Sequence, residues 1–124
     1  MKIRLQNGLL FADVSIIHYG KKLDIYNVIV DTGSTGTIFS IDKVADADIK
    51  PEPYDPVREI RGVGGTEFVF IKQVDKLTLG DFEINNFDIE VGAMEYGIQI
   101  NGIIGLDFLL KVKAKLDLDK LEIY

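Results

Sequence analysis

The feature that most constrains the fold of this chain is a lone carboxylate, Asp31, placed between two apolar runs. Val28-Ile29-Val30 has the character of a buried strand, Asp31-Thr32-Gly33-Ser34 follows it, and Thr37-Ile38-Phe39 is a second apolar run. A carboxylate at the end of a buried strand is costly unless hydrogen bonds hold it or chemistry uses it. The pattern therefore predicts a strand–turn–strand loop. In that loop Asp31 is either a catalytic group or a turn residue whose side chain caps its own backbone.

The remainder of the chain has the pattern of short β-strands separated by turns. Runs of Ile, Val, Leu, Phe and Tyr alternate with Gly, Asn and Asp, which predicts strands at 9–17 and 22–30 and a turn at Asn85-Asn86. Residues 58–61 and 66–71 flank Gly62-Val63-Gly64-Gly65, which is typical of a long hairpin with a glycine-rich tip. A terminal hairpin is expected from 114–117 and 121–124.

Two segments favour helix over strand. Residues 40–46 could hold one short helix with Ser40 as its candidate cap, and 106–111 is the strongest helix candidate. All three prolines lie in 50–56, which predicts an extended loop. At 124 residues the chain is expected to form a single all-β domain spanning 1–124, with one short C-terminal helix.

Composition excludes several classes of function. The chain has no cysteine, which removes disulfides, thiol catalysis and Cys-based zinc sites, and a single histidine, His18, which removes a His-rich metal site. A net charge of -6 argues against nucleic-acid binding. No apolar run approaches the ~20 residues that span a bilayer, and no secretory leader is expected at the N-terminus. We expect a cytoplasmic protein that uses no metal or cofactor.

Other catalytic and binding motifs fail on spacing. Gly33-Ser34-Thr35-Gly36 lacks the arrangement of a Gly-x-Ser-x-Gly nucleophile elbow, and the glycines at 62–65 lack the Lys-Ser/Thr of a phosphate loop. Asp117-Leu118-Asp119 lacks the Gly and distal Glu of a calcium loop and predicts a hairpin turn. We expect His18 to be a surface strand residue.

A second motif lies about seventy residues after the first. Gly102-Ile103-Ile104-Gly105-Leu106-Asp107-Phe108-Leu109 is again an apolar strand, a glycine and a helix. Together with Asp31-Thr32-Gly33-Ser34, the glycine-rich hairpin and the terminal hairpin, it resembles the retropepsin-like aspartic proteases, single-lobe relatives of pepsin, over nearly the whole chain. The resemblance implies a closed, barrel-like β lobe with a flap hairpin and aspartic endopeptidase activity on a peptide or protein substrate.

The resemblance also assigns roles to individual residues. Asp31 would activate the water, Thr32 would tie two loops together beneath the catalytic pair, and Gly33 would let backbone approach the substrate. Ser34 would contact substrate and is expected to donate a hydrogen bond to the Asp31 carboxylate, favouring its charged form. Gly62, Val63, Gly64 and Gly65 would cover the substrate, and Ile103 would line a side-chain pocket.

The chain carries only one Asp-Thr-Gly, which determines the partner that the chemistry needs. Peptide hydrolysis requires a base and an acid, which two carboxylates sharing one proton can supply. A pair therefore requires a second copy of the chain, and the resemblance implies a homodimer with Asp31 of each subunit at a two-fold axis. The ends, 2–5 and 121–124, could interleave between subunits or pair within one.

Two positions depart from the retroviral pattern, which has an acidic residue and an Arg where this chain has Thr35 and Leu106. Both partners of that ion pair are absent together, so no charge is left unpaired. Asp107 is better explained as a structural group that holds backbone amides near the helix start than as a second catalytic acid. The alternative function is a catalytically inactive dimerisation or peptide-binding module that retains Asp31 as a turn residue and captures an extended peptide by strand addition.

Overall fold

The strands of the protein follow the alternation expected from the sequence. The computed structural model describes residues 1–62, 65–95 and 99–124. Within these ranges the strands are β1 (Arg4–Gln6), β2 (Leu9–His18), β3 (Lys21–Val30), β4 (Ile38–Ser40), β5 (Val57–Gly62), β6 (Gly65–Leu79), β7 (Phe82–Gly92), β8 (Gly102–Ile104), β9 (Leu116–Asp117) and β10 (Glu122–Ile123). The helical segments are α1 (Ile41–Val44), the 3-10 turn η1 (Ala45–Ala47) and α2 (Leu106–Lys111). The predicted all-β class with a short C-terminal helix is confirmed.

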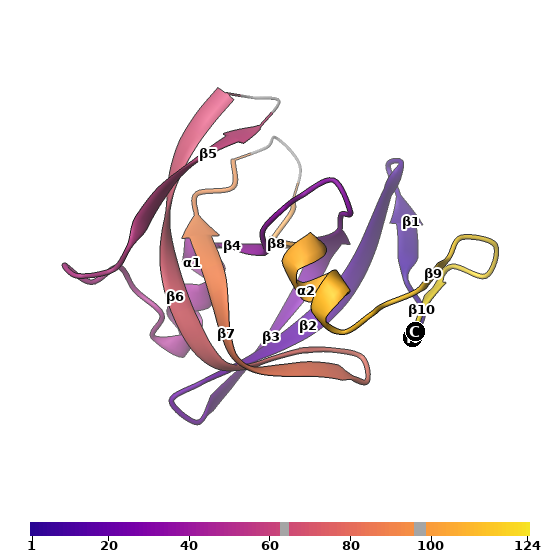
Figure 1. Cartoon of the computed structure of the whole chain (residues 1–124), viewed down its shortest axis with the longest axis horizontal. Helices are drawn as coiled ribbons and strands as arrows, with labels where there is room; N and C mark the ends of the chain where they lie inside the picture. Colours follow the sequence, from indigo (N-terminus) through magenta and orange to yellow (C-terminus); the bar gives the residue numbers. More distant parts are fainter. Residues whose placement is uncertain (63–64, 96–98) are drawn as a thin grey trace.

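The main sheet curls until it meets itself. Its eight strands run in the order β1-β2-β3-β8-β4-β7-β6-β5. A further pairing of β2 with β6 closes β2, β3, β8, β4, β7 and β6 into a ring (Figure 1). Helix α2 lies against this ring, while the hairpin of β5 and β6 rises above it. The loop after β3 is on the same upper side of the view as the upper end of β5.

Two apolar clusters fill the molecule. The larger lies inside the ring and includes the fully buried Phe39 and Phe108, with Phe108 meeting Phe87 edge to face at 5.7 Å between ring centroids. This edge-to-face arrangement is the one that aromatic quadrupoles favour. The smaller cluster contains Ile29, Ile38 and Val69, with Ile60, Ile71 and Ile103 against it. It brings the β5–β6 hairpin into contact with the strands that flank the Asp31 loop.

Two sequence predictions about the strands were wrong. The expected turn at Asn85-Asn86 is absent, because β7 runs through both residues. The register is the same on both sides of this point, with Val74 opposite Phe87 and Lys76 opposite Asn85, and Asn86 itself has φ 54°. Asparagine tolerates that left-handed backbone better than most residues, so the strand continues through Asn86 without a change of register.

His18 was the second error. It is the last residue of β2 and is buried rather than at the surface, and within the described residues its Nδ1 has no hydrogen-bond partner. Its ring lies 4.3 Å from that of Tyr19. Sequence alternation alone could not show that this position is buried.

The two ends of the chain pair with each other within the single chain. Lys2 lies opposite Glu122 in an antiparallel bridge, and the Ile123 amide donates to the Met1 carbonyl at 2.9 Å. The Ile3 amide donates to the Leu121 carbonyl at 3.0 Å. Of the two arrangements left open by the sequence, the chain therefore shows the one within a subunit. No helix in the described ranges has the length and apolar character needed to cross a membrane.

Candidate active site

The Asp31 loop is fixed at both ends by the ring. The Asp31 amide donates to the Ile104 carbonyl of β8 at 3.0 Å, and the Leu106 amide at the start of α2 donates to the Ser34 carbonyl at 2.8 Å. These bonds join the loop to the second motif, which is distant in sequence. The two motifs that carried the resemblance therefore form one unit in space.

The Asp31 side chain lies at the surface of this unit. Its Oδ1 accepts a hydrogen bond from the Gly33 amide at 2.8 Å, and Asp31 is partly exposed while Thr32 and Gly33 are exposed. A Cβ at Gly33 would lie 3.1 Å from that same Oδ1 and would crowd the carboxylate. Asp31 thus has its orientation set by the backbone while it stays accessible from outside the chain.

Ser34 does not make the hydrogen bond that we expected from the sequence. Its hydroxyl donates to the Gly36 carbonyl at 2.7 Å and not to the Asp31 carboxylate. A hydroxyl that donates to a carbonyl two residues further along the chain stabilises the shape of the loop. The predicted direct influence of Ser34 on the charge of Asp31 is therefore corrected.

The buried hydroxyl of Thr37, which was not among the predicted site residues, supports the Asp31 loop. Thr37 Oγ1 donates to Asp107 Oδ1 at 2.7 Å and accepts from the Gly105 amide at 3.1 Å. The Thr37 amide donates to Asp107 Oδ2 at 3.2 Å, and the Phe108 amide donates to Oδ1 at 2.8 Å. This is the structural role expected of Asp107. The available signal for Thr37 was a hydroxyl residue at the start of an otherwise apolar, buried strand.

Replacing Thr37 with valine is expected to destabilise the protein by about 2 kcal/mol, because the Gly105 amide and one Asp107 oxygen would lose a buried partner. Thr37→Ser is the matched control, since it keeps the hydroxyl and loses only a methyl group, at a cost of about 1 kcal/mol. Urea unfolding of the three proteins measures both values. A valine variant as stable as the serine variant would contradict this account of the network.

The hairpin of β5 and β6 carries the residues expected to cover a substrate. Gly62 and Gly65 lie opposite each other at its end, and Gly65 has φ +116°, a conformation that favours glycine. Val63 and Gly64 fall outside the described residues. Ile103 is on β8 between Ile29 and Ile38, in the smaller apolar cluster beneath the hairpin.

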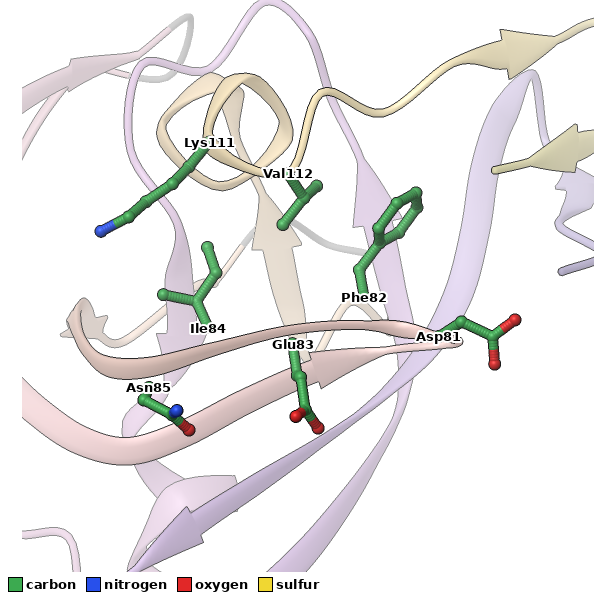
Figure 2. Close-up of a pocket in the computed structure, with 7 residues that line it drawn as sticks. All are labelled: Asp81, Phe82, Glu83, Ile84, Asn85, Lys111 and Val112. Carbon is green, nitrogen blue, oxygen red and sulfur yellow. The ribbon is translucent and has the colours of Figure 1, made fainter.

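An open pocket of about 550 Å³ lies elsewhere on the molecule (Figure 2). Its seven lining residues come from the β6–β7 turn, the start of β7 and the end of α2. Phe82, Ile84 and Val112 point toward one another, while Glu83 points away from them. None of the lining residues belongs to the Asp31 loop, so this pocket has no part in the chemistry of that loop. No group of three metal-ligating side chains occurs within the described residues.

The fold and the loop define an acid-protease class: a closed β ring, an Asp-Thr-Gly loop and a strand–Gly–helix unit bonded beneath it. The model of a family described as aspartyl protease matches residues 14–108 of the chain, which include the Asp31 motif, the hairpin and the second motif up to Phe108. The chain belongs to this family of retropepsin-like aspartyl proteases, which confirms the resemblance seen in the sequence. A search of the curated proteins finds no match to the chain.

Proposed function

We propose that the protein is an aspartic endopeptidase that hydrolyses peptide bonds as a homodimer, with Asp31 of each subunit forming the catalytic pair. The observation that carries the proposal is that the Asp31 loop holds an accessible carboxylate on a backbone fixed by hydrogen bonds. Its carboxylate is accessible and oriented by the Gly33 amide, while the Ile104 carbonyl and the Ser34–Leu106 bond fix its backbone. The family membership supports a function of the protease type.

The chemistry requires two carboxylates with different protonation states. Two such groups in contact cannot both ionise cheaply, so they hold one proton between them. The ionised partner takes a proton from the attacking water, and the protonated partner donates to the carbonyl oxygen of the scissile bond. A single Asp31 could do only one of these at a time. The second must come from another copy of the chain, with the exposed Thr32 joining the two loops.

Substrate would bind between the Asp31 loop and the β5–β6 hairpin. Gly33 leaves room for backbone close to the carboxylates, Ser34 follows it along the loop, and the segment 62–65 would close over the peptide and exclude water. Ile103 packs against the smaller apolar cluster and is partly buried, which suits apolar side chains of the substrate. Because the ends of the chain pair with each other, the subunit contact would centre on the Asp31 loops and not on interleaved termini.

Cleavage of an unfolded protein between about pH 3.5 and 7 tests the proposal, because this range brackets carboxylate pKa values raised by pairing. Fragments identified by mass spectrometry should appear in wild type, and activity per chain should rise with protein concentration as dimers form. Sedimentation at the same concentrations provides the control. A protein that is monomeric throughout and cleaves nothing would instead be a peptide-binding module.

A further inference from the structure

One row of paired residues crosses the sheet beneath the β5–β6 hairpin and is apolar except at a single position. Residues paired on neighbouring strands point to the same face of a sheet, so the register defines the row directly. From β2 to β6 its members are Phe11, Ile29, Ile103, Ile38, Glu90 and Ile71. All the members but Glu90 belong to the smaller apolar cluster or pack against it.

Glu90 is buried against the catalytic loop. Only 11% of its side chain is exposed, and its Oε1 lies 2.3 Å from where a Cβ on Gly36 would be. Gly36 is in the same loop as Asp31, so the carboxylate borders the segment on which chemistry is proposed. The absence of a side chain at Gly36 is what makes room for it.

The partner of Glu90 is exposed and replaceable. Arg58 of β5 places Nη1 3.3 Å from Glu90 Oε2, and 60% of the Arg58 side chain is exposed. Exposed cations exchange such contacts at little cost, because water screens the ion pair. Arg58 is also on the hairpin strand that would cover a substrate, so closure over a peptide would bring a substrate side chain toward the same carboxylate.

Other charges near Glu90 also affect the pKa of its carboxylate. Burial raises the pKa of Glu90, the Arg58 charge opposes that rise, and the carboxylates of Asp107 and Glu67 reinforce it. The Glu90 carboxylate is therefore disfavoured in its charged form by two neighbouring carboxylates and favoured by the Arg58 guanidinium. A second positive charge would find a favourable field there.

We propose that Glu90 is a specificity-determining residue whose carboxylate receives the positive charge of a lysine or arginine side chain of the substrate, in the place that Arg58 occupies in the free chain. The inference rests on the proposed function, because it assumes that a peptide lies between the hairpin and the Asp31 loop. The expected substrates are peptides with a basic residue a few positions from the scissile bond and apolar residues at the neighbouring positions.

The test measures peptide binding separately from cleavage. Fluorescent octapeptides of apolar residues, with lysine or norleucine placed at each position in turn, are titrated at pH 7 against Asp31→Asn protein by fluorescence anisotropy. At one position lysine is expected to bind about tenfold more tightly than norleucine, the scale of one charge-assisted hydrogen bond. Adding Glu90→Gln should bring the ratio of the lysine and norleucine affinities to about one.

Glu83→Gln is the matched control, because it makes the same chemical change at the far end of the same strand, where Glu83 pairs with Lys76 at the surface. It should retain the lysine preference. Equal binding of lysine and norleucine peptides, a preference that survives Glu90→Gln, or no binding of any peptide would each overturn the inference. A lysine preference that depends on Glu90, in a chain whose wild type cleaves none of the peptides, would uphold Glu90 as the group that receives a basic side chain and would contradict the protease proposal.

We expect the Glu90→Gln protein to fold, because glutamine keeps the size of the side chain and removes a charge that burial disfavours. Burial raises the pKa of Glu90 in the folded chain. At pH values between the unfolded and the folded pKa, this group therefore binds more protons in the folded state than in the unfolded state. Stability from this group therefore falls as pH rises through the raised pKa. Removing the charge should leave the variant at least as stable as wild type at pH 7, and thermal unfolding checks this.

Discussion

Asp31→Asn is expected to lower kcat/KM for peptide cleavage by about a thousandfold or more, because the catalytic pair would lose its only ionisable groups. Asparagine keeps the size of the side chain, and its Oδ1 can still accept the hydrogen bond that the Gly33 amide donates to Asp31 at 2.8 Å. The loop should therefore keep its shape, and thermal unfolding should change little. The comparison separates a catalytic Asp31 from one that only caps its turn.

Asp81→Asn provides the control for this experiment. Asp81 is an exposed carboxylate in the turn between β6 and β7, so its replacement makes the same change in net charge away from the Asp31 loop. Wild-type activity in the Asp81 variant with none in the Asp31 variant supports the assignment. Equal cleavage by the two variants would exclude Asp31 as the catalyst.

Gly105→Ala is expected to cause the largest loss of stability, about 3 kcal/mol or more, with activity lost alongside. A Cβ at Gly105 would lie 2.2 Å from the Gly36 carbonyl oxygen and 2.8 Å from that of Ser34. Both contacts are with backbone of the Asp31 loop, which cannot move aside as a flexible side chain can. The loop and the start of α2 would have to separate, breaking the hydrogen bond between the Leu106 amide and the Ser34 carbonyl.

Gly8→Ala distinguishes this clash from the general cost of replacing glycine. Gly8 has φ +76° and nothing within 4 Å of its Cβ position, so alanine there costs only the left-handed backbone, about 1 kcal/mol. Urea unfolding gives both values. A Gly105 variant no less stable than the Gly8 variant would show that the loop and helix are not packed as closely as described.

Local pattern was sufficient to predict the elements that flank the candidate site. Apolar runs and their glycines predicted the strand before Asp31, the β5–β6 hairpin and the helix after Gly105, because each depends on residues near one another in sequence. The pairing of the two motifs came from the resemblance. Their actual contacts, such as the Asp31 amide with the Ile104 carbonyl, join positions that no local pattern connects.

The residues that sequence reasoning missed owe their roles to such distant contacts. Thr37 gains its role from Asp107 and Gly105, and Ser34 donates to Gly36 because of the way its loop turns. Glu90 lies between Ile89 and Val91, so alternation on a one-sided strand would place it toward solvent. It is buried because the hairpin and the Asp31 loop cover that face of β7, which only the closed sheet reveals.

The most direct test of the shared catalytic pair is activity in mixtures of wild-type and Asp31→Asn chains. The two are combined in denaturant at varied ratios and constant total concentration, refolded together, and assayed on one peptide. If each site takes one Asp31 from each of two chains, only wild-type pairs are active, and activity follows the square of the wild-type fraction. An equal mixture should then keep about a quarter of the activity. A fall in direct proportion to the wild-type fraction would show that each chain acts alone and would contradict the account.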